Sequence, residues 1–411
     1  MSLLKSTYFI FLSQFLLCSC MSQKAYKPLD IKDIIERDKE RLFTVYDTEE
    51  CLEGNSLKCH EGLLNSLKES EINKALINKF NLYEKNIEKN FLESGMVVGR
   101  ELHGEKRIPA DLCDSLLFSS LRYYALNRLY FNNMAYEAWR GILSAYVNGQ
   151  WYRHPDCLDT PISRDMFLGI MLLTNEDHPD SDKLLDNLTE IIDLNNGFFS
   201  FKHRLVSYLS PGLAKTYGKV LKNRNLKNSF VADKGFSTYF IEKPFLERDY
   251  RTHLLALHIF IEISLYEKFQ EPIESWVEDA SNKIYELDKD NQFYKFLKFK
   301  TMYLKGLIDY DNFKSRLEEI KYFLLKSRYF PSDTSPSYCT RGSDYLWQRT
   351  SDEWPKIRTE LEKLDSHKVH IDDDKTLLTK DGLYCSDIYW HGVDYMFLLS
   401  LVLETNLYSK K

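Results

Sequence analysis

The sequence predicts an all-α fold of layered helical hairpins, best described as an incomplete (α/α) toroid with a few short strands. Apolar residues recur at intervals of three and four along most of the chain, as they do in amphipathic helices. Residues 254–261 and 395–403 are apolar almost all round, so we expect other helices to enclose them. Helix pairs packed around enclosed helices, with no repeat of fixed period, favour a toroid over a regular solenoid. An irregular helical assembly is the alternative.

Helical spacing and capping residues locate the individual elements. Apolar residues recur at helical spacing from Leu117 to Ala125 behind a cap at Asp111. Ser210 followed by Pro211 is a cap with proline at the first helical position, which opens a helix that ends near residue 221. The other expected helices are 30–45, 57–91 with a break, 134–147, 163–173, 180–194, 248–269, 272–287, 290–304, 311–325, 355–364 and 386–403. Short strands are expected at 197–202 and 236–241.

The N-terminus has the layout of a secretory leader. Lys5 precedes an apolar run from Tyr8 to Leu17, which is shorter than the roughly 20 residues that span a bilayer. The run ends in Leu-Cys-Ser-Cys, which resembles the lipobox of bacterial lipoproteins and covers only the first twenty residues. This resemblance implies cleavage before Cys20, diacylglycerol on the Cys20 sulfur, and a lipid-anchored location in the bacterial envelope facing the periplasm or the exterior. An ordinary leader with a chance cysteine near its end is the alternative.

We expect four parts along the chain. Residues 1–19 form the signal peptide, 20–28 a flexible tether, 29–94 an N-terminal helical segment and 95–411 the toroid-like domain. The formal net charge of −6 lacks the strong positive field that phosphate binding needs, so nucleic acid is not an expected partner. The membrane is an expected partner through the lipidated Cys20.

Six cysteines remain in the expected mature chain, an even number in a compartment where disulfides persist. Cys51 and Cys59 flank a Gly-Asn turn, so a local bridge between them is the leading pair, with two free buried thiols as the alternative. The secondary expectation is two further pairs: Cys113 with Cys157, and Cys339 with Cys385. None of the six has Cys-x-x-Cys spacing, which argues against a zinc knuckle or a thioredoxin-like site.

Polar and aromatic side chains concentrate in three connections between the expected helices, residues 151–165, 328–355 and 384–394. Long connections inside a compact domain often bind ligands, and polar groups beside aromatic faces are typical of a binding groove. We expect the three connections to form one cleft with His253 at its floor. The expected catalytic residues are His154, Arg164, Asp165, His253, His391 and Asp394. The expected substrate-binding residues are Trp151, Tyr152, Arg341, Trp347 and Trp390.

These residues also have a structural interpretation. Ser163 can cap a helix, and Asp165 can stabilise the first turn of that helix through the helix dipole. Arg164 can pair with a neighbouring acid. His253 and His391 can be neutral core residues, His391 being held by its own helical neighbours.

Several chemistries are excluded by the sequence, and two classes of function remain. The chain has no Gly-x-Ser-x-Gly elbow, Walker A loop, dinucleotide glycine fingerprint or His-Glu-x-x-His helix, and the histidine spacing calls for no metal and no cofactor. A helical toroid in a bacterial envelope resembles polysaccharide lyases and glycoside hydrolases. This resemblance is architectural, covers residues 95–405 and rests on no diagnostic motif.

The resemblance implies a polysaccharide as substrate, with the chemistry set by which residues converge. In the lyase version, His154 or His253 takes a proton next to a uronate carboxylate that Arg164 or Arg341 neutralises. In the hydrolase version, Asp165 and Asp394 flank the scissile bond. The other class of function is an envelope lipoprotein without catalysis, which binds a glycan or a protein through the same groove or only supports an assembly.

Overall fold

The computed structural model describes the helical body of the chain and a set of short strands. The described residues are 71–103, 106–110, 112–160, 162–175, 178, 180–194, 198–202, 204–208, 211–226, 250–289, 291–326, 338–340, 369–371, 376–378, 384–386, 388–389 and 391–408. Eleven α-helices account for most of these residues, so the predicted all-α fold is confirmed. None of the described helices is long and apolar enough to cross a membrane.

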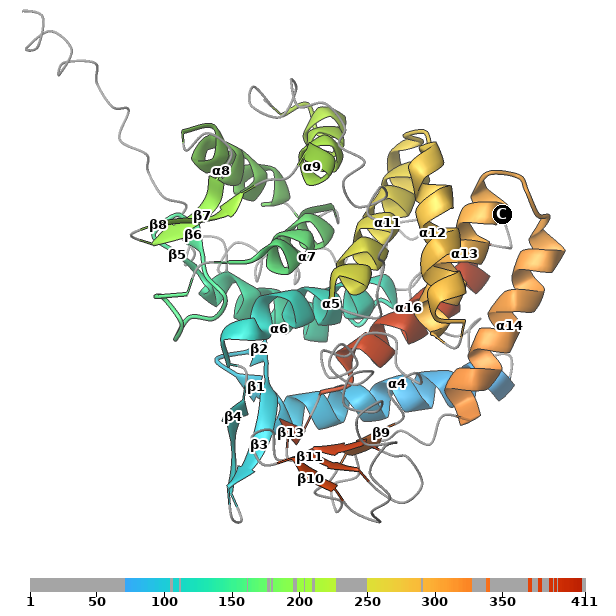
Figure 1. Cartoon of the computed structure of the whole chain (residues 1–411), viewed down its shortest axis with the longest axis horizontal. Coiled ribbons are helices and arrows are strands. Elements are labelled where there is room, and N and C mark those ends of the chain that lie inside the picture. The colour runs from blue at the N-terminus through green and yellow to red at the C-terminus, as the bar shows by residue number, and fades with distance from the viewer. Residues whose placement is uncertain are drawn as a thin grey trace, which may run out of the picture. The chain divides into compact units, whose positions relative to one another are not determined.

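Five of the helices form an inner ring. They are α5 (Ser115–Arg128), α7 (Arg164–Asn175), α11 (Tyr250–Phe269), α13 (Gln292–Leu304) and α16 (Val393–Tyr408). The ring follows chain order, because α5 packs against α7, α7 against α11 and α11 against α13, while α16 returns to α5 (Figure 1). Contact between Phe293 of α13 and Phe397 of α16 completes the circuit.

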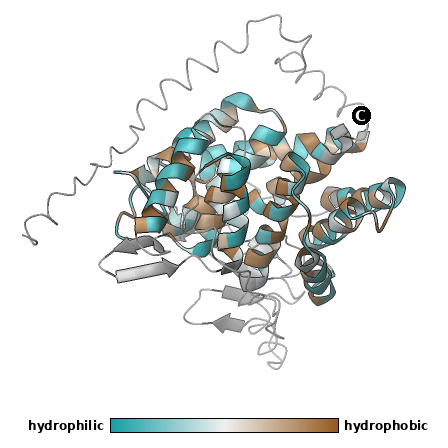
Figure 2. Ribbon diagram, turned by 90° about the horizontal axis from the view of Figure 1, so that it is seen from above, coloured by the Kyte–Doolittle hydropathy of each residue, from teal (hydrophilic) through white to brown (hydrophobic). Residues whose placement is uncertain are grey.

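Outer helices pack against the inner ring. They are α4 (Glu71–Asn90), α6 (Asn132–Ser144), α8 (Ser181–Leu194), α9 (Pro211–Asn223), α12 (Ser275–Leu287) and α14 (Tyr310–Lys326). Each packs against at least one inner helix, α6 against α5, α8 against α7, α9 and α12 against α11, and α14 and α4 against α16. Hydrophilic and hydrophobic residues lie close together along the helices (Figure 2). Apart from α8 and α9, which follow one another in the outer layer, the described helices alternate between an outer and an inner layer along the chain, as in an (α/α) toroid.

Helix α4 packs with the same body although it lies in the segment expected to be separate. It contacts both α14 and α16. The carboxylate of Glu84 accepts hydrogen bonds from Nε of Arg122 in α5, and both side chains are almost completely buried. This buried ion pair fixes how α4 packs on α5, because a packing that left either charge buried without its partner would have a much higher free energy.

Four aromatic rings from four inner helices meet at the centre of the ring. The centroid of Phe397 lies 5.4 Å from Tyr124, 5.2 Å from Phe260 and 5.8 Å from Phe293. Tyr124 and Phe260 lie 5.5 Å apart, edge to face. Such pairs each contribute about 0.5–1.5 kcal/mol beyond the burial of their area, so this aromatic cluster is a principal part of the core.

The inner helices begin at a common end of the ring. Helices α5 and α16 run parallel, because Phe118 contacts His391 while Tyr124, further along, contacts Phe397. The C-terminal ends of α7 and α11 meet where the Lys268 ammonium donates to the Asn175 carbonyl. The connections that precede inner helices therefore share one end, and we call it the entry end.

Short antiparallel strands occupy the connections. They are β1 (Leu92–Glu93), β2 (Met96–Val97), β3 (Gly99–His103), β4 (Lys106–Ala110), β5 (Tyr146–Val147), β6 (Gln150–Trp151), β7 (Phe198–Lys202), β8 (Arg204–Tyr208), β9 (Tyr338–Thr340), β10 (Val369–Ile371), β11 (Thr376–Leu378), β12 (Tyr384–Ser386) and β13 (Ile388–Tyr389). The larger sheets have the strand orders β13-β3-β4 and β10-β11-β12-β9, and the remaining strands pair as hairpins. Strand β7 was predicted from sequence.

The observed helices follow the predicted ones except at a few ends. The helix expected from residue 386 begins at Val393, because 384–386 and 388–389 pair as strands. The helix expected behind Asp111 begins at Ser115 after a 3-10 turn at Leu112–Asp114. Three expected elements, the helices at 30–45 and 355–364 and the strand at 236–241, lie outside the described residues.

Candidate functional site at the entry end

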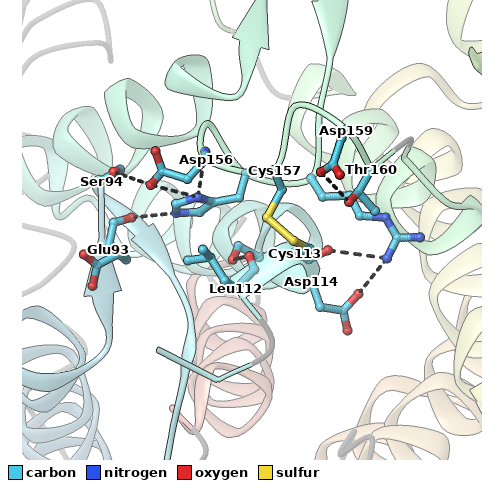
Figure 3. The surroundings of a disulfide bond; sticks show 12 residues. Glu93, Ser94, Leu112, Cys113, Asp114, Asp156, Cys157, Asp159 and Thr160 are labelled. Carbon is cyan, nitrogen blue, oxygen red and sulfur yellow. Dashed lines mark hydrogen bonds and ion pairs between the residues drawn. A yellow bond between two sulfur atoms is a disulfide. The ribbon is translucent and has the colours of Figure 1, made fainter. Parts of the chain in front are cut away.

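A disulfide joins the connection before α5 to the connection before α7. The Cα atoms of Cys113 and Cys157 lie 5.7 Å apart, and Cys157 is buried. This was one of the two secondary cysteine pairs expected from the sequence. Figure 3 shows the bridge with Asp156 on one side and Asp159 on the other. The Arg153 guanidinium lies 3.8 Å from Asp114 and adds an ionic contact between the same two connections.

Strand pairing joins the connection before α16 to the connection before α5. Ile388 and Tyr389 of β13 pair with Glu101 and Arg100 of β3. The connections before α5, α7 and α16 are therefore linked to one another at the entry end. Two of the three connections that the sequence singled out, 151–165 and 384–394, belong to this set.

His154 is fully buried, and both of its ring nitrogens are occupied. Nδ1 accepts a hydrogen bond of 3.1 Å from the backbone N–H of Asp156, so the proton resides on Nε2 and is donated to the Glu93 carbonyl at 3.1 Å. Burial lowers the pKa of His154, which favours this neutral form. In this geometry His154 fastens its connection to β1, and neither nitrogen is available to a substrate.

Ser163 and Asp165 stabilise the start of α7. The Ser163 hydroxyl donates to the Asp165 carboxylate, and the Ser163 carbonyl accepts from the Phe167 N–H at 3.0 Å. The hydroxyl and the carboxylate are therefore engaged with each other at the first helical turn. Arg164 is exposed at the same turn and is open to an anion from solution.

His391 is a buried neutral residue at the approach to α16. Its Nδ1 accepts from the Val393 N–H at 3.1 Å, and its ring lies 4.5 Å from Phe118 and 6.4 Å from Phe91. Burial lowers the pKa of His391 to about 3. Since Glu93 contacts His154 and Phe91 contacts His391, the two imidazoles lie against the same short segment of chain.

His253 lies in the first turn of α11, and Asp394 lies in the first turn of α16; both are buried. The ring of His253 lies 6.1 Å from the ring of Tyr294, in the first turn of α13. His253 precedes Phe260 by seven positions, so it lies about 10 Å along α11 from that member of the aromatic cluster. An imidazole and a phenol at the start of neighbouring inner helices can act together as proton acceptor and proton donor.

The two aromatic residues of the first connection differ in their environment. Trp151 is only 5% exposed and packs 5.0 Å from Tyr146, so it is a core residue and not a surface platform. Tyr152 is half-buried, and its hydroxyl lies 3.4 Å from the Gln150 side chain. Other predicted residues lie outside the described part: Cys20, Cys51, Cys59, Arg341, Trp347 and Trp390.

Two groups of polar residues were not predicted from the sequence. Tyr294 escaped notice although Asn291 caps α13 just before it, accepting from the backbone N–H of Phe293 and Tyr294. A buried set around His258 was hidden inside the apolar run of α11. Among the described residues, no group of three or more His, Cys, Asp or Glu side chains could hold a metal ion.

No protein-family model and no curated protein sequence matches the chain. Its function therefore has to be inferred from the chemistry of the entry end. Among the described polar residues there, Arg164 is exposed and Tyr152 is half-buried, whereas His253, Tyr294 and Asp394 are buried.

Proposed function

We propose that this protein is a bacterial envelope lipoprotein whose helical domain binds and cleaves an acidic polysaccharide at the entry end of the inner ring. The observation that carries the proposal is the pair His253 and Tyr294, whose rings lie 6.1 Å apart at the start of two neighbouring inner helices. The linked connections before α5, α7 and α16 support it, because they hold the starts of three other inner helices together.

The chemistry that fits this pair is β-elimination. His253 takes the proton from the sugar carbon next to the uronate carboxylate, and the electron pair moves to form a carbon–carbon double bond. The glycosidic carbon–oxygen bond on the adjacent carbon breaks, and Tyr294 gives a proton to the leaving oxygen. Arg164 supplies positive charge for the carboxylate, and the helix N-termini at the entry end add partial positive charge.

The test uses the full-length protein against acidic and neutral polysaccharides, with the ultraviolet absorbance of the unsaturated product as readout. We expect cleavage of an acidic polymer, its loss in His253→Ala and a lower kcat in Tyr294→Phe. Tyr303→Phe, near the opposite end of α13, is the matched control and should leave kcat unchanged. Unimpaired cleavage by His253→Ala would refute the assignment of the base.

Binding without catalysis is the second candidate. It is favoured by the internal hydrogen bonds of His154 and Asp165, which remove two of the acid–base groups expected from the sequence. In that case Tyr152→Ala should weaken the affinity for a glycan by about 1–3 kcal/mol, the scale of one aromatic contact. A polysaccharide that is bound and left intact would favour this candidate, and the absence of both binding and cleavage would eliminate the two together.

A further inference from the structure

Strands β9 and β12 bring two cysteines to the same register position. The strands pair antiparallel, with Tyr384 opposite Thr340, Cys385 opposite Cys339, and Ser386 opposite Tyr338. Directly opposed residues of an antiparallel pair have Cα atoms about 4.5–5.5 Å apart. A disulfide requires a Cα separation of about 4.4–6.8 Å, so the backbone at this position meets the requirement.

We infer that Cys339 and Cys385 form a second disulfide in the exported protein. Each thiol gives up a proton as the sulfur–sulfur bond forms, and the pair gives up two electrons. The electron acceptor is the disulfide of an envelope thiol oxidoreductase, which becomes a dithiol in the exchange. This step needs the oxidising compartment that the leader implies.

The bond would fix the connection that leads into α16. Strand β12 is followed by β13, which pairs with β3, and then by His391 and the first turn of α16. The two cysteines are 46 positions apart in the sequence, close to the separation of 44 between Cys113 and Cys157. Both bridges would therefore hold connections that precede inner helices, one before α5 and α7 and the other before α16.

The test is a peptide map of the full-length protein exported to an oxidising compartment. The protein is denatured in iodoacetamide without reductant, digested and analysed by mass spectrometry. We expect one cross-linked species that contains Cys339 and Cys385 and that disappears after reduction. Alkylation of both cysteines, or a link from either one to another cysteine, would overturn the inference.

Two variants make the assignment specific. In Cys385→Ser we expect Cys339 to become fully alkylated, whereas in Cys113→Ser the Cys339–Cys385 species should persist. The wild-type map is decisive by itself if either variant fails to fold. This result is independent of the proposed lyase activity, because the readout is a covalent bond and not turnover.

Discussion

At the scale of single residues, Gly392 determines how the chain enters α16. Its φ is +68°, and a Cβ at this position would lie 2.5 Å from Cε1 of Tyr83 in α4. The Tyr83 ring in turn stacks on Tyr395 at 4.6 Å. Glycine is needed here both for its backbone conformation and for the space next to the Tyr83 ring.

We expect Gly392→Ala to lower the free energy of unfolding by about 1–3 kcal/mol from backbone strain alone, with the clash against Tyr83 adding to this. Gly306→Ala is the matched control, since φ is +70° there and nothing lies within 4 Å of the added Cβ. Gly306→Ala should lose only the free energy that comes from backbone strain. Urea denaturation measures the free energy of unfolding of both variants, and an equal loss in the two would contradict the role assigned to Tyr83.

The pKa of His391 predicts how stability changes with pH. The folded value of about 3 lies below the ordinary value of 6.5 in the unfolded chain. Below pH 6.5 the unfolded state therefore binds a proton that the folded state does not, and stability falls as the pH falls from 6.5 towards 3. Between pH 7 and pH 5 this costs about 2 kcal/mol.

The matched variant is His391→Asn, whose amide oxygen can still accept the hydrogen bond from Val393. We expect its free energy of unfolding, measured in urea at pH 7 and pH 5, to fall by about 2 kcal/mol less than that of the wild type. The remaining dependence comes from His258 and His154, whose pKa values are also lowered by burial. An unchanged pH dependence in this variant would refute the prediction.

At the scale of elements, a buried polar network holds α9 against α11 and α12. The Lys219 ammonium lies 2.6 Å from Glu262 and 2.7 Å from Glu274. The Thr216 hydroxyl donates to Glu262 at 2.6 Å, so at 2.5 Å it accepts from Nε2 of His258. Because Thr216 has one hydroxyl proton and gives it to Glu262, His258 is the neutral Nε2–H tautomer.

Removing the central cation should weaken this joint strongly. We expect Lys219→Met to lower the free energy of unfolding by about 3 kcal/mol, because it leaves Glu262 buried without its charge partner. Lys222→Met is the matched control on the same helix. Lys222 pairs with Glu271 at 3.0 Å but is 71% exposed, so its loss should cost less than about 1 kcal/mol. Thermal denaturation measures the Tm of the two variants. Equal decreases in Tm would count against a buried network.

The sequence was a good guide to helices and a poor one to strands, for a physical reason. Helices such as α8 and α12 (Ser275–Leu287) are long enough for the 3.6-residue spacing to show repeatedly. Strands such as β13 and β5 have two residues each, too few to show an alternation. Strand β13 also pairs with a partner far along the chain, because Ile388 lies opposite Glu101. The local sequence therefore does not predict this pairing.

At the scale of the whole molecule, a common end for the connections before α5, α7 and α16 could be predicted, but the contacts of the side chains there could not. Alternating hairpins bring every second connection to one end, which follows from the order of the helices. Whether a polar side chain there is free depends on close contacts, such as those that occupy both nitrogens of His154. The partner of His253, Tyr294, comes from another helix and has no sequence signature.

The proposed anchor gives a prediction for the full-length protein. Two acyl chains on one residue bind a bilayer stably, whereas a single chain binds only marginally. We expect Cys20→Ala to move the protein from the membrane fraction to the soluble fraction. Immunoblotting of the two fractions measures this. Cys18→Ala is the matched control and should stay with the membrane. A Cys20→Ala protein that remains in the membrane fraction would rule out the lipid anchor.

The aromatic cluster at the centre of the inner ring has a consequence for the handling of a polymer. Because Tyr124, Phe260, Phe293 and Phe397 fill the axis with side chains, a polysaccharide cannot thread through the ring. If the proposed cleavage takes place beside His253, the polymer cannot continue past the aromatic cluster and has to leave by the way it came. Each encounter would then end in dissociation, so the proposed activity would consist of single cuts.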